Sequence, residues 1–230
     1  MSATSDSVAP SVGWGVVHLF CKFNAETDPQ GVLAAVKAAQ EGDHQVVSVA
    51  VLGHKADLGF MAVGPDLWRL REFQAGLAKA GMEVVDSYVS LTELSEYSQG
   101  LPEEVRQARL FPRLPPPGKS AFCFYPMSKR RNPSQNWYTL DFERRRDLMY
   151  GHGATGRTFA GRIVQVITGS AGLDDFEWGV TLFGAHPDDL KEVVYTMRYD
   201  EASAEYAEFG PFITGMVAPA DEVVSRIGLA

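Results

Sequence analysis

Short apolar runs alternate with amphipathic segments along the whole chain, and Gly, Pro or Asp residues separate most of them. Apolar runs of about four to eight residues predict strands, and apolar positions three and four apart predict helices. Leu67, Leu70, Phe73 and Leu77 show the helical spacing, just after Gly64-Pro65-Asp66. The predicted elements of the first half are a strand at 14–23, a helix at 29–41, strands at 45–52 and 58–63, a helix at 67–80 and a strand at 84–91.

The second half repeats this order after a Pro-rich stretch at 111–117, which can form neither a helix nor a central strand. Its predicted elements are a strand at 122–125, a helix at 141–151, strands at 165–170 and 178–184, a helix at 189–202 and a strand at 211–217. Two units of the order strand–helix–strand–strand–helix–strand predict an α+β protein made of tandem ferredoxin-like repeats. Chance similarity between two α/β halves is the alternative. We divide the chain into a disordered tail (1–12), a first half (13–110), a connector (111–119) and a second half (120–230).

The composition argues against nucleic-acid-binding, membrane-spanning and secreted proteins. The chain has 21 Lys and Arg against 29 Asp and Glu, a net charge of −8, which argues against binding to a nucleic-acid backbone. No apolar run approaches the roughly 20 residues that span a bilayer, and the first residues lack a signal-peptide pattern. Cys21 and Cys123 lie far apart within apolar runs, so we expect buried free thiols and a cytoplasmic protein, rather than a secreted one with a disulfide.

The stretch GHGATG at 151–156 matches the spacing of a dinucleotide-binding loop but follows a charged amphipathic segment, not a buried strand. We therefore reject a Rossmann site and expect these glycines to end the helix and leave His152 beside open space. The histidines form no zinc-binding pair. The glycines beside His152 would let a large planar group approach it, although a lone histidine is more often a surface or core residue.

A basic cluster follows a tyrosine at 125–131, in the sequence YPMSKRR. In an acidic chain, three consecutive cations predict an anion site, because Lys and Arg hold carboxylates. A solvated loop is the alternative interpretation.

Several blocks in a fixed order resemble the coproheme decarboxylases of the chlorite dismutase-like superfamily: YPMSKRR, NWY, HGATGR, QVITGSAGLDDFEWGVTLF and MRYDEASAEYAEFG. The resemblance is dense over 87–217. It implies tandem ferredoxin-like units that form one barrel (a dimeric α+β barrel) in each subunit of a homopentamer. It also implies the last step of a haem pathway, in which hydrogen peroxide oxidises iron-coproporphyrin III (coproheme). Two propionates lose CO₂ and become vinyl groups, giving haem b. The coproporphyrin ferrochelatase is then an expected partner.

The resemblance also implies roles for single residues, all within the second half except Arg109. His152 matches the axial ligand of the iron, Tyr125 matches a tyrosine that becomes a radical, and Gln165 occupies the distal position. Glu201 is a weaker candidate, expected to accept a hydrogen bond from the second nitrogen of His152. Trp137 is also a weaker candidate, expected to lie behind the residues that touch the substrate. The residues expected to hold the substrate's propionates are Arg109, Met127, Lys129, Arg198 and Ser203.

Other functions stay open at this point. A chlorite dismutase carries an arginine at the distal position, whereas this sequence has Gln165 there and also keeps Tyr125, and both residues favour decarboxylation. A dye-decolorising peroxidase would need a GxxDG motif, which is missing from the sequence. A non-catalytic haem-binding or haem-transfer protein would keep His152 and the cations but have no use for Tyr125. A structural barrel without a cofactor would need none of these residues.

Overall fold

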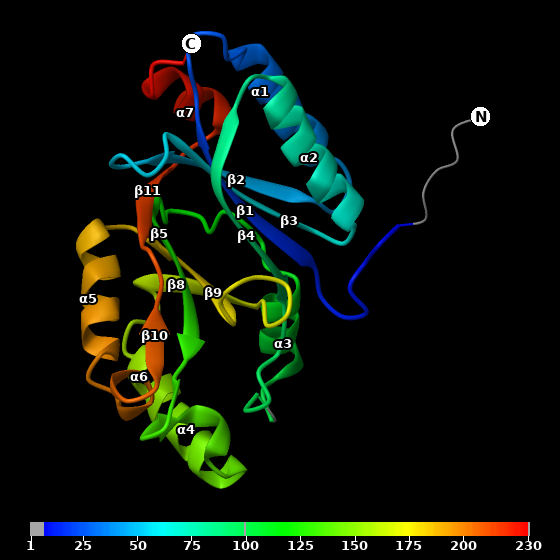
Figure 1. Cartoon of the computed structure of the whole chain (residues 1–230). Coiled ribbons are helices and arrows are strands. Elements are labelled where there is room, and N and C mark those ends of the chain that lie inside the picture. The colour runs from blue at the N-terminus through cyan, green and yellow to red at the C-terminus, as the bar shows by residue number, and fades with distance from the viewer. Residues whose placement is uncertain (1–6, 99, 230) are drawn as a thin grey trace.

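The main sheet of this chain is antiparallel and closes on itself, and two short strands pair separately (Figure 1). The structure, a computed structural model, describes residues 7–98 and 100–229. The elements of the first half are β1 (Gly15–Lys22), α1 (Pro29–Ala39), β2 (Gln45–Val51), β3 (Leu58–Gly64), α2 (Leu67–Lys79), β4 (Glu83–Thr92) and α3 (Glu103–Leu110). Those of the second half are β5 (Ala121–Lys129), β6 (Arg131–Asn132), β7 (Gln135–Asn136), a 3₁₀ turn (Trp137–Thr139), α4 (Phe142–Arg157), β8 (Ile163–Gly169), β9 (Trp178–Gly184), α5 (Pro187–Met197), α6 (Glu201–Ala204), β10 (Ala207–Phe209), β11 (Ile213–Val217) and α7 (Ala220–Arg226).

Hydrogen bonds run through the strand order β5–β11–β2–β3–β1–β4–β8–β9, and β9 pairs again with β5, so the sheet closes into a barrel. Two of these pairings join the halves of the chain, β2 with β11 and β4 with β8. β10 adds to the end of β5 at Met127–Lys129. The result is an α+β fold with an antiparallel sheet.

Alternate residues of β5 show how the core is divided between the two faces of the barrel. Phe122 and Phe124 point inward and pack with Phe20 and Phe183 in the interior. Burying each of these rings contributes on the order of 2 kcal/mol. Tyr125 points to the opposite face and joins a second apolar cluster with Cys123, Val180 and Leu182 of the sheet and with Leu190 and Val193 of α5.

The helices cover different parts of the barrel's outer surface (Figure 1). α1, α2 and α7 pack on the first-half strands through one apolar cluster. α5 lies on β5 and β9. α4 and α6 pack against each other at the opposite end from α1, at the bottom of the view. A site built from α4, α6 and the outer face of β5 therefore belongs to the second half.

Helix starts follow the sequence expectations in the first half. Asp28 and Asp66 cap α1 and α2, because their carboxylates accept hydrogen bonds from the backbone N–H groups of Gln30 and Trp68, each at 3.0 Å. The Pro-rich connector separates α3 from β5 without regular structure.

Two expectations for the second half are wrong. The glycines at 151–156 do not end the helix, since α4 continues to Arg157. The expected helix at 189–202 is two helices, because Asp200 leaves helical geometry and caps α6 through the backbone N–H of Ala202. The short elements α3, β10 and α7 were not expected.

Of the expected tail at 1–12, residues 1–6 lie outside the described residues. Residues 7–12 form no helix or strand, although the carbonyl of Val8 accepts a hydrogen bond from the N–H of Leu67. Both cysteines are free and buried, as expected, and burial raises the pKa of the Cys21 thiol to about 12 and that of Cys123 to about 11. Among the described residues, no helix combines the length and apolar character needed to cross a membrane.

Candidate functional site

The outer face of β5 presents three of the expected residues in a row, because side chains alternate along a strand. Tyr125 and Lys129 are buried, and they lie two residues before and two residues after the half-buried Met127. β9 and β8 continue this face, since Cys123 pairs with Leu182 and Leu182 pairs with Gln165. Gln165 thus lies on the same outer surface as Tyr125, two strands away, and it is exposed.

Tyr125 is held by aromatic rings from the chain segment that follows α6. Its ring stacks on Phe212 at 4.5 Å between centroids and contacts Phe209 at 5.6 Å. Arg198, at the end of α5, lies over the other ring partner, with its guanidinium 5.2 Å from the centroid of Phe209. Burial raises the pKa of Tyr125, with the positive charge of Arg198 acting in the opposite direction. The phenol is therefore kept protonated near neutral pH in a fixed orientation.

His152 lies on α4, with 27% of its side chain exposed, and contacts the start of α6. Its Nδ1 is 3.0 Å from a carboxylate oxygen of Asp200 and 3.4 Å from the hydroxyl of Ser203. Burial raises the pKa of Asp200, but hydrogen bonds from His152 and Ser203 outweigh it and give a net lowering. An ionised carboxylate can only accept, so Nδ1 carries the proton and Nε2 is left free to bind a metal ion.

Lys129 connects β5 to α6, the helix that carries the partner of His152, Asp200. Its ammonium donates to the carbonyl of Ala202 at 3.1 Å and lies 4.1 Å from the ring centroid of Trp137. Burial lowers the pKa of Lys129 to about 8, against the opposing effect of the carboxylates of Asp200 and Glu177. Lys129 is thus a buried cation that can lose its charge in mildly alkaline solution.

The glycines of α4 leave open space along the helix that carries His152. A Cβ atom added to Gly151 or Gly156 would meet no atom within 4 Å, and one added to Gly153 would meet only the guanidinium of Arg157, at 3.4 Å. Gly156 lies one turn beyond His152, on the same face of the helix. The expectation of space for a planar group near His152 therefore agrees with the geometry, although the glycines lie inside the helix.

Not every expected residue joins this arrangement. Glu201 does not contact His152; its carboxylate pairs with Arg144, and the adjacent Asp200 takes the expected role. The difference arises because Asp200 is the capping residue of α6, which turns its side chain toward α4. Arg109 is exposed at the end of α3 and donates to the hydroxyl of Ser98 at 3.0 Å. Ser203 bonds to the His152–Asp200 pair.

Glu177 is a functional candidate that the sequence did not indicate. This buried carboxylate accepts a hydrogen bond from the backbone N–H of Lys129 at 2.8 Å, and Arg131 approaches it to 3.9 Å. It precedes β9 in a run of acidic residues and Trp, with nothing in the spacing to distinguish it. Asp200 had a detectable signal, because an Asp before Glu-Ala-Ser-Ala is typical of a helix N-cap.

Two cavities lie away from His152 and Tyr125, although Glu177 lines the second of them. One of about 670 Å³ is bounded by α1, α7 and the connector. Another of about 330 Å³ lies beside the ends of β4 and β8, near Glu93 and Trp178.

The sequence profile of the family described as chlorite dismutase matches residues 26–218. The chain belongs to the chlorite dismutase family. Two similar relatives are the coproheme decarboxylases of Staphylococcus carnosus and Staphylococcus saprophyticus. The first is 44% identical over 199 residues, covering 81% of this chain and 78% of the relative. The second is 43% identical over 200 residues, covering 82% and 78%.

Solved structures of similar proteins have the same fold. A protein of Thermus thermophilus described as a novel heme-binding protein is 36% identical, with a TM-score of 0.86 over 96% of this chain and 99% of that one. A mutant chlorite dismutase from Candidatus Nitrospira defluvii has a TM-score of 0.75 at 18% identity, over 95% of this chain and 97% of that one. The second likeness supports the fold alone.

Proposed function

We propose that this chain is a coproheme decarboxylase, which converts two propionates of iron-coproporphyrin III into vinyl groups at the expense of hydrogen peroxide and so makes haem b. Two relatives at 43% and 44% identity carry that name, and another relative is described as heme-binding. The single observation that carries the proposal is the His152–Asp200 contact on a glycine-containing helix. Among the described residues no hydrogen bond engages Nε2, and Gly156 leaves space on the same face of the helix.

The residues fit an iron porphyrin with propionate groups. His152 would bind the iron through Nε2, because Asp200 holds the proton on Nδ1 and orients the ring. Arg198 supplies positive charge near Tyr125, and Lys129 supplies it further along β5, near Asp200, where propionates would be held. Met127 would contact the substrate from the face of β5 that carries Tyr125. Gln165 would face the side of the porphyrin opposite to His152. Arg109 would reach a propionate from α3 by releasing Ser98.

Each decarboxylation removes two electrons and one proton from a propionate. These, with one further proton from the solvent, reduce one peroxide molecule to two molecules of water. The bound substrate supplies this redox chemistry through its iron. Tyr125 loses an electron together with its proton, because burial disfavours the charged phenolate. The phenoxyl oxygen then takes a hydrogen atom from the β-carbon of the propionate, which restores the phenol. Loss of the second electron breaks the bond to the carboxylate, and CO₂ leaves.

Three further features belong to this proposal. The two halves are tandem ferredoxin-like repeats, supported by the same order of strands and helices in each. The subunits assemble as a homopentamer in the cytoplasm, where free thiols such as Cys21 and Cys123 persist. An iron-inserting enzyme, the coproporphyrin ferrochelatase, must supply the substrate.

A peroxide titration tests the function. The ligand-free protein is mixed with coproheme, peroxide is added in steps, and the porphyrin masses are followed. Two successive losses are expected, each corresponding to CO₂ and two hydrogen atoms, with one peroxide used for each. A coproheme complex that bleaches without either loss would identify a non-catalytic binding protein.

A further inference from the structure

Helix α4 has little apolar anchoring for a helix that carries a metal ligand. Every residue of α4 is described, and among them only Leu148 is buried. Each glycine inside a helix costs about 1 kcal/mol relative to alanine. His152 lies in the glycine-containing part, where its contact with Asp200 ties it to α6. A second restraint, toward α5 and the strand face of Tyr125, lies at the C-terminal end of the helix.

The chain just beyond α4 connects it to the strand face that holds Tyr125. Phe159 is buried in the same apolar cluster as Tyr125 and Val180. Gly161 then adopts a positive φ of 79°, which glycine tolerates, and the chain turns into β8. The position of α4 relative to Tyr125 is therefore set over a few residues after the helix.

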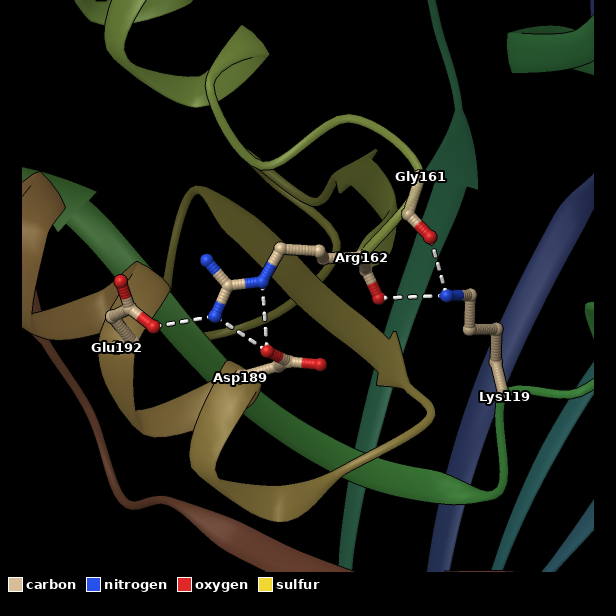
Figure 2. A network of polar contacts seen from close by, with 5 residues as sticks. All are labelled: Lys119, Gly161, Arg162, Asp189 and Glu192. Atoms are coloured by element: carbon tan, nitrogen blue, oxygen red, sulfur yellow. Dashed lines mark hydrogen bonds and ion pairs between the residues drawn. The ribbon is translucent and has the colours of Figure 1, made fainter.

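A polar network secures this turn from two sides (Figure 2). Arg162 donates from Nε and Nη2 to one carboxylate oxygen of Asp189, at 2.8 and 2.5 Å, and also pairs with Glu192. From the connector, the ammonium of Lys119 donates to the carbonyls of Gly161 and Arg162 at 2.5 and 2.9 Å. The network thus joins the end of α4 to α5 and to the connector.

The contact with Asp189 differs from an ordinary surface ion pair. The Asp189 side chain is only 9% exposed, and a carboxylate that loses its partner in such a position is strongly destabilised. The Arg162 guanidinium also lies 5.3 Å from the ring centroid of Phe159, so the ionic contact and the apolar anchor support each other. Glu192 is more than half exposed and adds little.

We propose that Arg162, assisted by Lys119, is a positioning residue for His152: it fixes the C-terminal end of α4 against α5 and so sets where the imidazole stands relative to Tyr125. The proposal rests on the proposed function in one respect, that His152 is the iron ligand. Neither Arg162 nor Lys119 touches the site residues themselves, so both act through the helix.

The first measurement uses the ligand-free protein. Hydrogen–deuterium exchange is followed over α4 in wild type, Arg162→Gln and Lys119→Met. Protection of the α4 amides should fall by about tenfold in Arg162→Gln and less in Lys119→Met, because the opening of a segment sets its exchange rate. Arg226→Gln is the matched control, because it removes an exposed pair with Glu222 at 2.8 Å on α7. Wild-type protection of α4 in both test variants would overturn the proposal.

The second measurement uses the coproheme complex. The vibration of the bond between iron and imidazole should shift or broaden in Arg162→Gln, and coproheme should dissociate faster, whereas Arg226→Gln should match wild type. Reduced exchange protection of the α4 amides together with an unchanged iron–imidazole vibration would mean that Arg162 has a structural role alone, and would overturn the proposal. If Arg162→Gln fails to fold, Lys119→Met decides by the same two readouts. A wild-type complex without an imidazole ligand would instead contradict the proposed function.

Discussion

Single side chains of this protein owe their chemistry to their surroundings. Lys129 is the clearest case, because a surface lysine keeps its charge far above neutral pH, whereas burial lowers the pKa of Lys129 to about 8. Its positive charge is present below that pH and lost above it. A cation that binds a propionate therefore does so only in the lower range.

The contribution of Lys129 to coproheme affinity should consequently be constant below about pH 8 and weaken above it, by at most about tenfold per pH unit for one linked proton. The measurement is a set of equilibrium titrations spanning roughly one to two pH units on either side of that pKa, with Lys129→Met as the comparison. That variant should bind more weakly at neutral pH and lose the extra alkaline decline. Identical pH profiles for the two proteins would exclude Lys129 as a propionate partner.

Gln165 should leave chlorite turnover negligible. Its neutral amide can donate a hydrogen bond but lacks the permanent charge that an arginine offers an anionic oxidant. An oxygen electrode measures the result after chlorite is added to the coproheme or haem b complex. Rapid oxygen evolution by the wild-type protein would support chlorite dismutase activity instead.

The sequence indicated which residues belong to the candidate site better than it indicated the contacts between them. The blocks containing Tyr125, Lys129 and His152 placed these residues in one half of the chain, and the structure connects them through α6 and β5. The choice between Asp200 and Glu201 depended on which of two adjacent side chains caps α6. The N-cap pattern favours Asp200 for the cap, but only the turn itself shows that the capping carboxylate also reaches His152.

At the scale of elements, α4 shows why local pattern was insufficient. Three glycines within six residues predict the end of a helix, yet α4 continues, because capping by Asp141 at one end and the Arg162 contacts after the other hold it. The tertiary contacts outweigh the low helix propensity of glycine. The glycines are then best explained by the space they leave beside His152.

Substitutions at Gly156 should separate stability from binding. Gly156→Ala should raise the free energy of unfolding of the ligand-free protein by about 1 kcal/mol, because alanine favours the helix and its Cβ meets no atom within 4 Å. Gly156→Leu should also fold but bind coproheme much more weakly, since its side chain enters the space on the His152 face. Denaturant unfolding and coproheme titration measure the two effects.

Gly151→Leu is the matched control, about 100° around the helix from His152. It should bind coproheme more tightly than Gly156→Leu. Equal losses in the two variants would mean that the open face of α4 does not receive the substrate.

For the whole molecule, the closed barrel depends on pairings that no local pattern contains. The order of elements in each half was visible in the sequence, but β2 pairs with β11 and β4 with β8 across the two halves of the chain. Only the resemblance to known proteins indicated a barrel. The site follows from this closure, because β8, β9 and β5 together form the outer face that holds Gln165 and Tyr125.

The surface of the barrel is consistent with assembly into an oligomer. Val89 and Leu173 are 41% and 49% exposed and belong to neighbouring segments, since the carboxylate of Asp174 accepts a hydrogen bond from the N–H of Val89. Apolar side chains that gather on a surface are typical of subunit contacts. Light scattering at micromolar concentration should therefore find an oligomer, with a pentamer expected. A fully active monomer would contradict this prediction.

The central claim is that Tyr125 performs the oxidation of a propionate held beside it. The most direct test is the mass of the porphyrin after a peroxide titration of Tyr125→Phe. Phenylalanine keeps the ring contacts with Phe212 and Phe209 but has no O–H to lose, so coproheme should bind and neither propionate should be decarboxylated. Tyr138→Phe, which changes an exposed phenol in the same half, should still give haem b. Normal loss of both carboxyl groups by Tyr125→Phe would contradict the account.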